Sequence, residues 1–476
     1  MTIAATQAGP AEAPTTGTAA SRAADEIVAR LERLPFTGFH LHLASMLGVG
    51  TFFDAYDSLV ISVALTVVFN SLHISFVNAG LLIGAAYIGQ FVGAIVFGYL
   101  GERLGRKPAF VLALGLFGLL SFVTALTWDF QSLLIARIIQ GVGLGAEVPL
   151  AAALFNEYIR GKNRGTVGML YQTLFFWGLF LAPLIGLGMI SAFGPELGWR
   201  AAFVVGGIPL LVAIVAHFRL PESARWLAEH GRATEADRIV SGIEASARAR
   251  GVQLEQPEVR YRADVQPTRF GELFSPRYRG RTFMNWVLWF ASYFLQAGYT
   301  VWLPTLYVQI GGLPADRALA LTLVSSATAV IAAYLAAWAM DHLGRKPLFL
   351  FGYGVAIVGA LVGVGAVGLL HQTGWPTLFA AGWLMTFGIS LTTGSLFVYT
   401  AELTPTRMRA WATATGSSVN RAVGFIAPTI VGALLATQLG IGGVFGLLLI
   451  TSLIGFVTMK FFGIETRQRV LEELSA

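Results

Sequence analysis

The segment "GYLGERLGRKPAF" at residues 98–110 decides the fold of this chain, because the chain contains a second copy of it. The segment "AAWAMDHLGRKPLFL" at residues 336–350 repeats its Leu-Gly-Arg-Lys-Pro core. A second pair of segments, "NEYIRGKNRG" (156–165) and "AELTPTRMRA" (401–410), places a glutamate seven residues before an arginine in each copy. Two repeated segments in the same order predict that the chain consists of two similar halves in tandem.

The composition indicates a membrane protein. The chain is 55% hydrophobic and only 12% charged, far below the charge of a soluble domain. Apolar stretches of about 20 residues, each long enough to cross a bilayer as a helix, recur along it. We predict an all-α membrane protein with twelve transmembrane helices in two six-helix halves. The expected spans are 41–69, 76–100, 108–128, 131–157, 165–190, 199–218, 282–308, 318–340, 347–370, 376–401, 410–438 and 441–463.

The spans divide the chain into five parts. The N-terminal tail, 1–40, contains no apolar core that would suit a cleavable signal. Its residues 21–34 form an amphipathic pattern with Ile27, Leu31 and Leu34 on one face, for which we expect a helix resting at the membrane interface. Two six-helix bundles, 41–218 and 282–463, are joined by a linker with short helices, 219–281, and followed by a C-terminal tail, 464–476.

Basic residues gather in alternate connections between the spans. This asymmetry predicts that both tails and the linker are cytoplasmic. It also argues against nucleic-acid binding despite the net charge of +6, because the charge lies where membrane topology requires it. Arg137 and Arg421 are the two basic residues that remain at membrane depth. The chain has no cysteine and therefore no disulfide framework.

Several motifs resemble those of the major facilitator superfamily. The repeated segment at 98–107 is similar to its loop signature, and "PESARWL" (221–227) to the motif that closes the sixth span in its sugar porters and organic-ion transporters. "GIETR" (463–467) resembles the signature after the last span, with Ile464 where proline is usual. "FFDAYDSLVIS" (52–62) and "RIIQGVGLGAE" (137–147) look like the first and fourth spans of niacin and aromatic-acid transporters. The resemblance implies a central cavity lined by spans 1, 4, 7 and 10.

Charged residues of the repeated motifs suit a cytoplasmic gate. Acids at the helix ends of one half would pair with arginines of the other, closing the cytoplasmic side until the halves rock apart. The alternative is that the acids are solvated and that the basic residues only reflect the positive charge of cytoplasmic loops. Each pair would then contribute under about 1 kcal/mol of stability. The expected gate residues are Glu102, Arg103, Arg106, Lys107, Glu157, Arg164, Glu222, Arg225, Asp341, Arg345, Lys346, Glu402 and Arg409.

Three acids lie at membrane depth in the N-terminal half, where ionisable groups often mark proton pathways. Asp54 and Asp57 share one part of span 1, and Glu147 lies in span 4, ten residues after Arg137. By resemblance to proton-coupled sugar porters, Asp57 and Arg137 occupy the positions of a proton switch. A static ion pair bracing the two spans is the alternative. Asp54 is either a second proton site or a water contact, and Glu147 either a proton site or a packing residue.

Arg421 lies near the middle of span 11, and the C-terminal half has no acid at comparable depth. Because an unpaired buried guanidinium is costly, we expect a transient anionic partner, and its planar fork matches a carboxylate. The alternative is pairing with Glu147 or a span-1 aspartate across the cavity. Aromatic side chains of spans 5 and 7 suit a flat ring, although they also pack helix bundles. The expected substrate-binding residues are Arg421, Asn420, Tyr293, Gln296, Tyr299, Phe175 and Tyr171.

We therefore expect a proton-coupled symporter that imports a small aromatic or organic carboxylate, such as nicotinate or a benzoate-like acid, by alternating access. A sugar or organic-cation porter of the same fold is the alternative, and a non-transporting receptor is the alternative in another class. No nucleophile, metal-ligand cluster or phosphate-cradling loop predicts an enzyme, a metal or a cofactor. The expected partners are a small organic anion, protons and the lipid bilayer of a bacterial inner membrane, and we expect a monomer.

Overall fold

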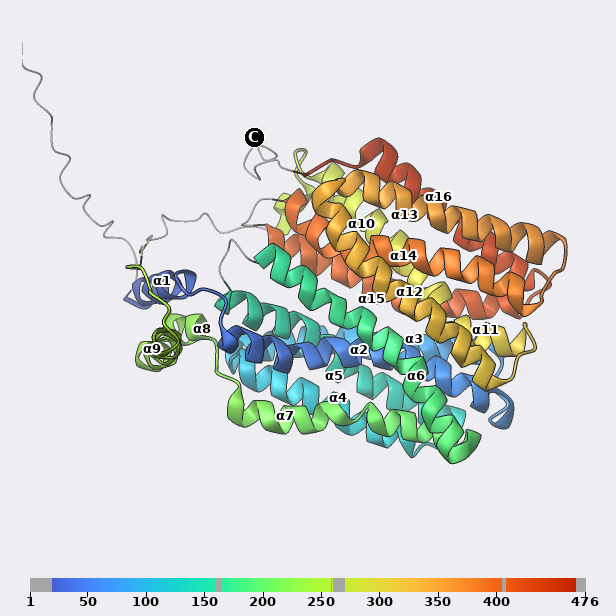
Figure 1. The fold of residues 1–476 in the computed structure, drawn as a ribbon, viewed down its shortest axis with the longest axis horizontal. Helices are drawn as coiled ribbons and strands as arrows, with labels where there is room; N and C mark the ends of the chain where they lie inside the picture. Colours follow the sequence, from blue (N-terminus) through green and yellow to red (C-terminus); the bar gives the residue numbers. More distant parts are fainter. Residues whose placement is uncertain (1–18, 160–163, 258, 260–269, 405–407, 468–476) are drawn as a thin grey trace, which may run out of the picture.

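The chain folds into a bundle of long helices divided into two halves. The computed structural model describes residues 19–159, 164–257, 259, 270–404 and 408–467, and every regular element in this part is a helix. Figure 1 shows the N-terminal half, blue to green, beside the C-terminal half, yellow to red. Within the described ranges, ten helices are long and apolar enough to cross a membrane.

The N-terminal half is preceded by one short helix and followed by the linker helices. Its helices are α2 (Gly38–Ser71), α3 (Phe76–Arg103), α4 (Arg106–Ala125), α5 (Phe130–Tyr158), α6 (Arg164–Val205) and α7 (Ile208–Arg219). The tail and the linker contribute α1 (Ala19–Glu32), α8 (Ala224–Glu229), α9 (Ala233–Ala249) and the 3₁₀ turn η2 (Phe270–Phe274).

The C-terminal half repeats the arrangement, with one helix interrupted by a π turn and another ending in one. Its elements are α10 (Arg279–Leu295), η3 (Gln296–Thr300), α11 (Leu303–Gln309), α12 (Ala315–His342), α13 (Arg345–Val362), η4 (Gly363–Leu369), α14 (Trp375–Leu403), α15 (Arg409–Leu435) and α16 (Gly440–Phe462).

The ten long helices follow the path of the twelve expected spans. Expected spans 5 and 6 both lie in the continuous segment Tyr171–Arg219, which is kinked at Gly194, where the φ angle is +75°. Gly198 packs against the backbone of Ile190, so the chain turns back sharply there. Expected span 7 is divided into α10, η3 and α11, so no single helix of it reaches the length of a span.

Glycines allow two helices of the N-terminal half to pack backbone against backbone. A Cβ atom at Gly89 or Gly93 of α3 would overlap the α5 backbone, and one at Gly141 or Gly145 of α5 would overlap that of α3. Small residues let membrane helices approach in this way. The close approach fixes α5, which carries Arg137 and Glu147, against the wall of the central cavity.

The halves pack together toward one end of the bundle. We call the end with the Arg106 and Arg345 loops the basic end and the other the opposite end. Toward the opposite end, Gly80 and Gly84 of α3 lie against the backbone of α15 at Pro428 and Phe425. Val63, Ile190 and Leu319 form an apolar cluster there that joins α2, α6 and α12. The bundle is therefore closed at the opposite end.

Helix α1, which was predicted to rest at a membrane interface, packs its apolar face against protein. It packs against α8 and α9, and Figure 1 shows the three helices together beyond the basic end. Ile27, Leu31 and Leu34, the predicted apolar face, are buried in that contact together with Val240 and Ile243 of α9. The amphipathic pattern predicted a buried apolar face but not its partner, because such a face can be buried against protein as well as against lipid.

Candidate functional site

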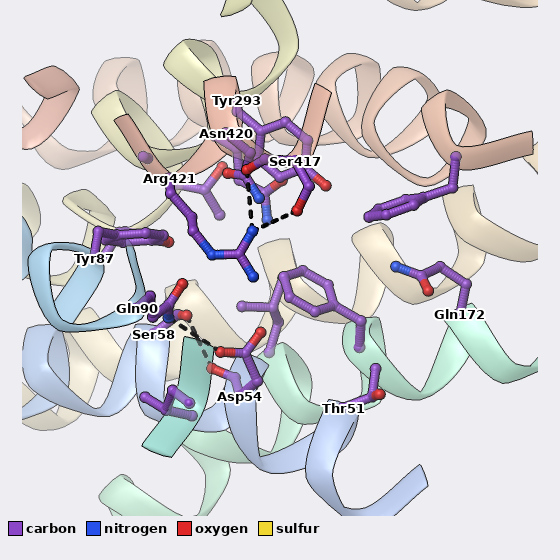
Figure 2. A pocket seen from close by; sticks show the side chains of 18 residues that line it. Thr51, Asp54, Ser58, Tyr87, Gln90, Gln172, Tyr293, Ser417, Asn420 and Arg421 are labelled. Atoms are coloured by element: carbon purple, nitrogen blue, oxygen red, sulfur yellow. Dashed lines mark hydrogen bonds between the residues drawn. The ribbon is translucent and has the colours of Figure 1, made fainter. Parts of the chain in front are cut away.

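A central cavity lies between the halves, and Figure 2 shows polar side chains converging on it. Helices of both halves contribute, so the cavity lies where a rocking motion would act. Its lining residues are Thr51, Asp54, Ser58, Tyr87, Gln90, Leu144, Gln172, Phe175, Leu179, Tyr293, Gln296, Ala297, Thr300, Val301, Phe397, Ser417, Asn420 and Arg421.

Arg421 extends from α15 into this cavity (Figure 2). Its Nη1 donates to the hydroxyl of Ser417 at 2.6 Å, one helical turn earlier. Its Nη2 donates to the backbone carbonyl of Gly145 in the other half at 2.8 Å. The Nε atom is buried and has no hydrogen-bond partner among the described residues. The guanidinium is thus held by neutral oxygens and keeps unused donor capacity.

Arg421 makes no ion pair within 4.0 Å with an acid in the described part of the chain. Pairing with Glu147 or with a span-1 aspartate, the alternative to substrate binding, is therefore not present in this conformation. Asp54 is the acid that shares the cavity, and Figure 2 shows its carboxylate on the side toward the guanidinium. The Gln90 amide donates to Asp54 Oδ1 at 3.3 Å. The cavity accordingly contains one cation and one acid that are not in contact.

Aromatic side chains form part of the cavity wall, as predicted for Phe175 and Tyr293. Tyr293 is stacked on Trp289 with ring centroids 5.3 Å apart, which fixes the orientation of its ring. Tyr87 and Phe397 also line the cavity and were missed from sequence. A rigid aromatic wall suits a flat apolar ring.

Two predicted cavity residues are not in the cavity lining. Tyr299 is buried against Gly382 of α14 and the Phe445 ring of α16. The Tyr171 hydroxyl donates to the carbonyl of Leu47 at 3.0 Å and accepts from Thr51 at 2.9 Å, so it binds α2 rather than the cavity. The prediction was wrong for both tyrosines.

The π turn η3 presents polar groups to the cavity. Gln296 and Thr300 lie at its two ends, and both line the cavity. The Gln296 Oε1 and Thr300 Oγ1 atoms are buried and have no hydrogen-bond partner in the described chain. Single π turns are frequent at functional sites. These two orphan groups could bind a polar substituent of a ligand.

Asp57 and Arg137 form the predicted ion pair. Arg137 Nη1 lies 2.7 Å from both carboxylate oxygens of Asp57, and the two side chains are only 1% and 3% exposed. Gln140 completes the cluster by donating to Asp57 Oδ1 at 2.9 Å and accepting from Arg137 at 2.8 Å. The pair joins α2 to α5 behind the cavity wall, because neither residue is part of the lining.

Glu147 is isolated. It is fully buried beside Gly50 of α2, and neither of its carboxylate oxygens has a hydrogen-bond partner among the described residues. A buried ionised carboxylate without a partner would be very costly. Glu147 therefore differs from Asp57, which has the Arg137 guanidinium within hydrogen-bond distance.

The charged pairs at the basic end join helices of one half, not of opposite halves as predicted. Arg106 lies 2.9 Å from Glu102 and 3.8 Å from Glu157. In the C-terminal half Arg345 lies 2.6 Å from Glu402 and 3.9 Å from Asp341. Among the described residues, each of these arginines is thus paired with acids of its own bundle.

The two repeat loops are capped by symmetric glutamates. Glu222 accepts from the first backbone N–H groups of α4, those of Arg106 and Lys107, at 3.0 and 3.1 Å. Glu465 accepts from Arg345 and Lys346, at the start of α13, at 3.0 and 2.9 Å. Burial opposes ionisation of Glu465, but these backbone donors outweigh it and hold the pKa of that carboxyl below its ordinary value. Carboxylates are favoured at helix N-termini.

The remaining residues predicted for the gate make local contacts. Arg103 lies over the Tyr99 ring, and Arg225 pairs with Glu229 on an exposed helix turn. Lys346 Nζ donates to the carbonyl of Gly463 and Arg409 Nε to that of Ala401, both at 3.0 Å. The side chain of Arg164 lies outside the described residues.

Sequence reasoning missed the residues that hold the charged groups in place. Ser417, Gln140 and Glu465 each bind a predicted residue directly. A usable signal existed for two of them. Ser417 and Gln140 lie four and three residues from an intramembrane arginine, on the same helix face.

The sequence of this chain is similar to those of known transporters. The family model described as "Sugar (and other) transporter" matches residues 43–476. The niacin transporter NiaP of Acinetobacter baylyi is 30% identical over 94% of this chain and 99% of its own length. The 4-hydroxybenzoate transporter PcaK of the same organism is 32% identical over 72% of this chain and 73% of its own length.

Among solved structures, the xylose transporter XylE from E. coli, in a partially occluded inward open conformation, is similar with a TM-score of 0.71 and 19% identity. The match covers 91% of this chain and all of that one. These similarities confirm the predicted fold and identify a multi-pass membrane transporter rather than an enzyme. The chain belongs to the family described as "Sugar (and other) transporter".

Proposed function

We propose that this protein is a proton-coupled symporter that imports a small aromatic carboxylate. Nicotinate and hydroxybenzoate-like acids are the first choices. One observation carries the proposal, namely that the buried guanidinium of Arg421 lines the central cavity without an ion-pair partner among the described residues.

The cost of that charge favours an anionic substrate. Arg421 is only 9% exposed, and a cation at membrane depth costs at least about 2.5 kcal/mol unless it is compensated. Hydrogen bonds to Ser417 and Gly145 reduce this cost but supply no negative charge. A carboxylate would supply both the charge and two acceptors in the plane of the guanidinium.

The rest of the cavity favours an aromatic ring with a polar substituent. Phe175, Tyr293 and Phe397 offer flat apolar walls. Gln296 and Thr300 offer an acceptor and a hydroxyl that lack partners, which suit a ring hydroxyl or a pyridine nitrogen. The names of NiaP and PcaK, a niacin and a 4-hydroxybenzoate transporter, point to the same ligand class.

Proton coupling is proposed for the acids of the N-terminal half. Asp57 has a permanent cation at 2.7 Å in this conformation, so a motion that separates α2 from α5 would raise its proton affinity. Asp54 lies within the cavity and would respond to a bound anion. Glu147, with no partner for either oxygen among the described residues, is the third candidate for carrying a proton.

Closure at the opposite end represents one state of an alternating-access cycle. Basic residues gather at the basic end, which the positive-inside rule assigns to the cytoplasm, together with α1 and the linker. The cavity would then face the cytoplasm of a bacterial inner membrane. The similarity to the partially occluded inward open conformation of XylE agrees with this assignment.

Thermal-shift measurements on purified protein test the substrate class, because a ligand that binds the folded state raises the melting temperature. Nicotinate and 4-hydroxybenzoate should stabilise the protein, whereas nicotinamide, xylose and choline should not. Arg421→Ala should weaken acid binding at least about tenfold, since charge-assisted hydrogen bonds contribute about 1.5–3 kcal/mol each.

Arg317→Ala, which removes an exposed arginine of the same half, is the matched control and should bind the acids normally. Stabilisation by xylose alone would favour a sugar porter. Acid binding by folded Arg421→Ala within twofold of wild type would show that the arginine is structural.

A further inference from the structure

The hydrogen bond between Arg421 and Gly145 joins the two halves inside the cavity. Its donor lies on α15 of the C-terminal half and its acceptor is a backbone carbonyl of α5 in the N-terminal half, 2.8 Å away. Helix carbonyls are normally occupied by the N–H group four residues later. A free carbonyl in the middle of a buried helix therefore requires an explanation.

Pro149 supplies that explanation. It lies inside α5, four residues after Gly145, and proline has no N–H group to donate. The carbonyl of Gly145 thus lacks its usual helical donor at membrane depth, where an unsatisfied backbone group is costly. Arg421 provides the missing donor from the other half of the protein.

The bond leaves the guanidinium able to bind a carboxylate. Nη2 carries two hydrogens, of which Gly145 needs one, and Nε has no partner among the described residues. Nε and Nη2 form one edge of the guanidinium group, so a carboxylate can bind that edge while Gly145 keeps its bond. The hydroxyl of Ser417 holds the remaining nitrogen at 2.6 Å.

We propose that Pro149 is a positioning residue for substrate binding. By leaving the Gly145 carbonyl without a helical donor, it anchors the Arg421 guanidinium of one half on the other and pre-orients it toward the substrate carboxylate. Arginine has many side-chain rotamers, and fixing them before binding raises affinity. This inference rests on the proposed function only for the identity of the ligand.

Pro149→Ala tests the inference because it restores an N–H group to α5 and frees Arg421 from its anchor. Affinity for nicotinate and 4-hydroxybenzoate should fall about three- to tenfold, the effect of one lost hydrogen bond of ordinary strength. Any weak binding of the neutral analogues nicotinamide and 4-hydroxybenzamide should not change. Pro183→Ala in α6 removes a helix proline of the same half and should leave acid affinity within twofold.

A second measurement needs no ligand. Arg421→Met should lower the melting temperature more in the wild-type background, where it orphans the Gly145 carbonyl, than in Pro149→Ala, where α5 satisfies that carbonyl itself. If the wild type binds no acid, the proposed function fails and this melting cycle still decides the inference. Equal losses in both backgrounds, or unchanged acid affinity in Pro149→Ala, would overturn it.

Discussion

Three acidic residues at membrane depth in the N-terminal half have different surroundings. Asp57 is ion-paired with Arg137, Asp54 faces the cavity, and Glu147 has no described partner. A charge at membrane depth is costly unless it is compensated, so the three carboxyl groups are not equivalent. Arg421 of the other half lines the same cavity as Asp54.

Asp57→Asn should separate exchange from coupling. The amide keeps the shape of the side chain but cannot carry the proton, so the variant should exchange substrate and fail to concentrate it under a pH gradient. Removing one partner of a buried pair also costs about 3–5 kcal/mol of stability, so folding should be checked by melting. Counterflow and gradient-driven uptake in proteoliposomes measure the two activities.

Asp57→Glu, which keeps the carboxyl group, is the control and should retain coupling in part. Concentrative uptake by Asp57→Asn at the wild-type level would mean that the Asp57–Arg137 pair is a static brace between α2 and α5.

Single residues were predictable from sequence where membrane depth alone singles them out. Arg421, Asp54 and the Asp57–Arg137 pair are charges in apolar spans, and the structure places them in or beside the cavity. Tyr299 was predicted on the face of Gln296 by α-helical spacing. The π turn η3 has more residues per turn, which rotates Tyr299 toward α14 and α16 instead. No sequence pattern marked that turn.

At the scale of elements, α1 is fastened to α9 by a charged cluster as well as by its apolar face. Arg30 binds Glu244 through two nitrogens, both at 3.0 Å, and also pairs with Asp237. Arg33 binds the same glutamate at 2.7 Å. Burial opposes ionisation of Glu244, but the hydrogen bonds from both arginines outweigh it and hold the pKa of its carboxyl below the ordinary value.

The docking of α1 should therefore depend on pH. A carboxyl whose pKa is lowered in the docked state contributes stability above its ordinary pKa of about 4.3, and this contribution is lost as pH falls through the lowered value. Hydrogen exchange of α1, corrected for the intrinsic pH dependence of exchange, should show strong protection at pH 7 and reduced protection near pH 3.5.

Glu244→Gln should reduce the protection of α1 already at pH 7. Glu235→Gln, which removes an exposed glutamate of the same helix paired with Arg232, should leave the protection unchanged. Equal protection in wild type and Glu244→Gln at pH 7 would show that the apolar face alone holds α1.

Element positions were easier to predict than element partners. Charge patterns placed acids and arginines at the basic end, but they do not specify whether a pair joins one half or both. The structure pairs Arg106 with Glu102 and Glu157, and Arg345 with Glu402, each within its own half. Partner choice depends on how the helices pack in three dimensions, which the charge pattern along the chain does not specify.

For the whole molecule, the repeated loops predicted the two-half architecture correctly. Glu222 caps α4 and Glu465 caps α13, so each carboxylate fixes the same turn in its half. This capped turn is the structural feature that the two repeated loops share. Closure at the opposite end follows from packing of α3 on α15, and of α6 on α12. Glycine-rich helix surfaces make this packing possible, yet they do not indicate which end is closed in one conformation.

We propose that a pH gradient drives an aromatic carboxylate through the cavity to which Arg421 contributes its charge. Uptake of labelled nicotinate and 4-hydroxybenzoate into proteoliposomes, acidic outside, measures this transport. Protein-free vesicles and Arg421→Ala vesicles correct for passive entry of the protonated acid. We predict accumulation above both controls that a protonophore abolishes. Uptake no greater than in the controls, or gradient-driven accumulation of xylose instead, would contradict the claim.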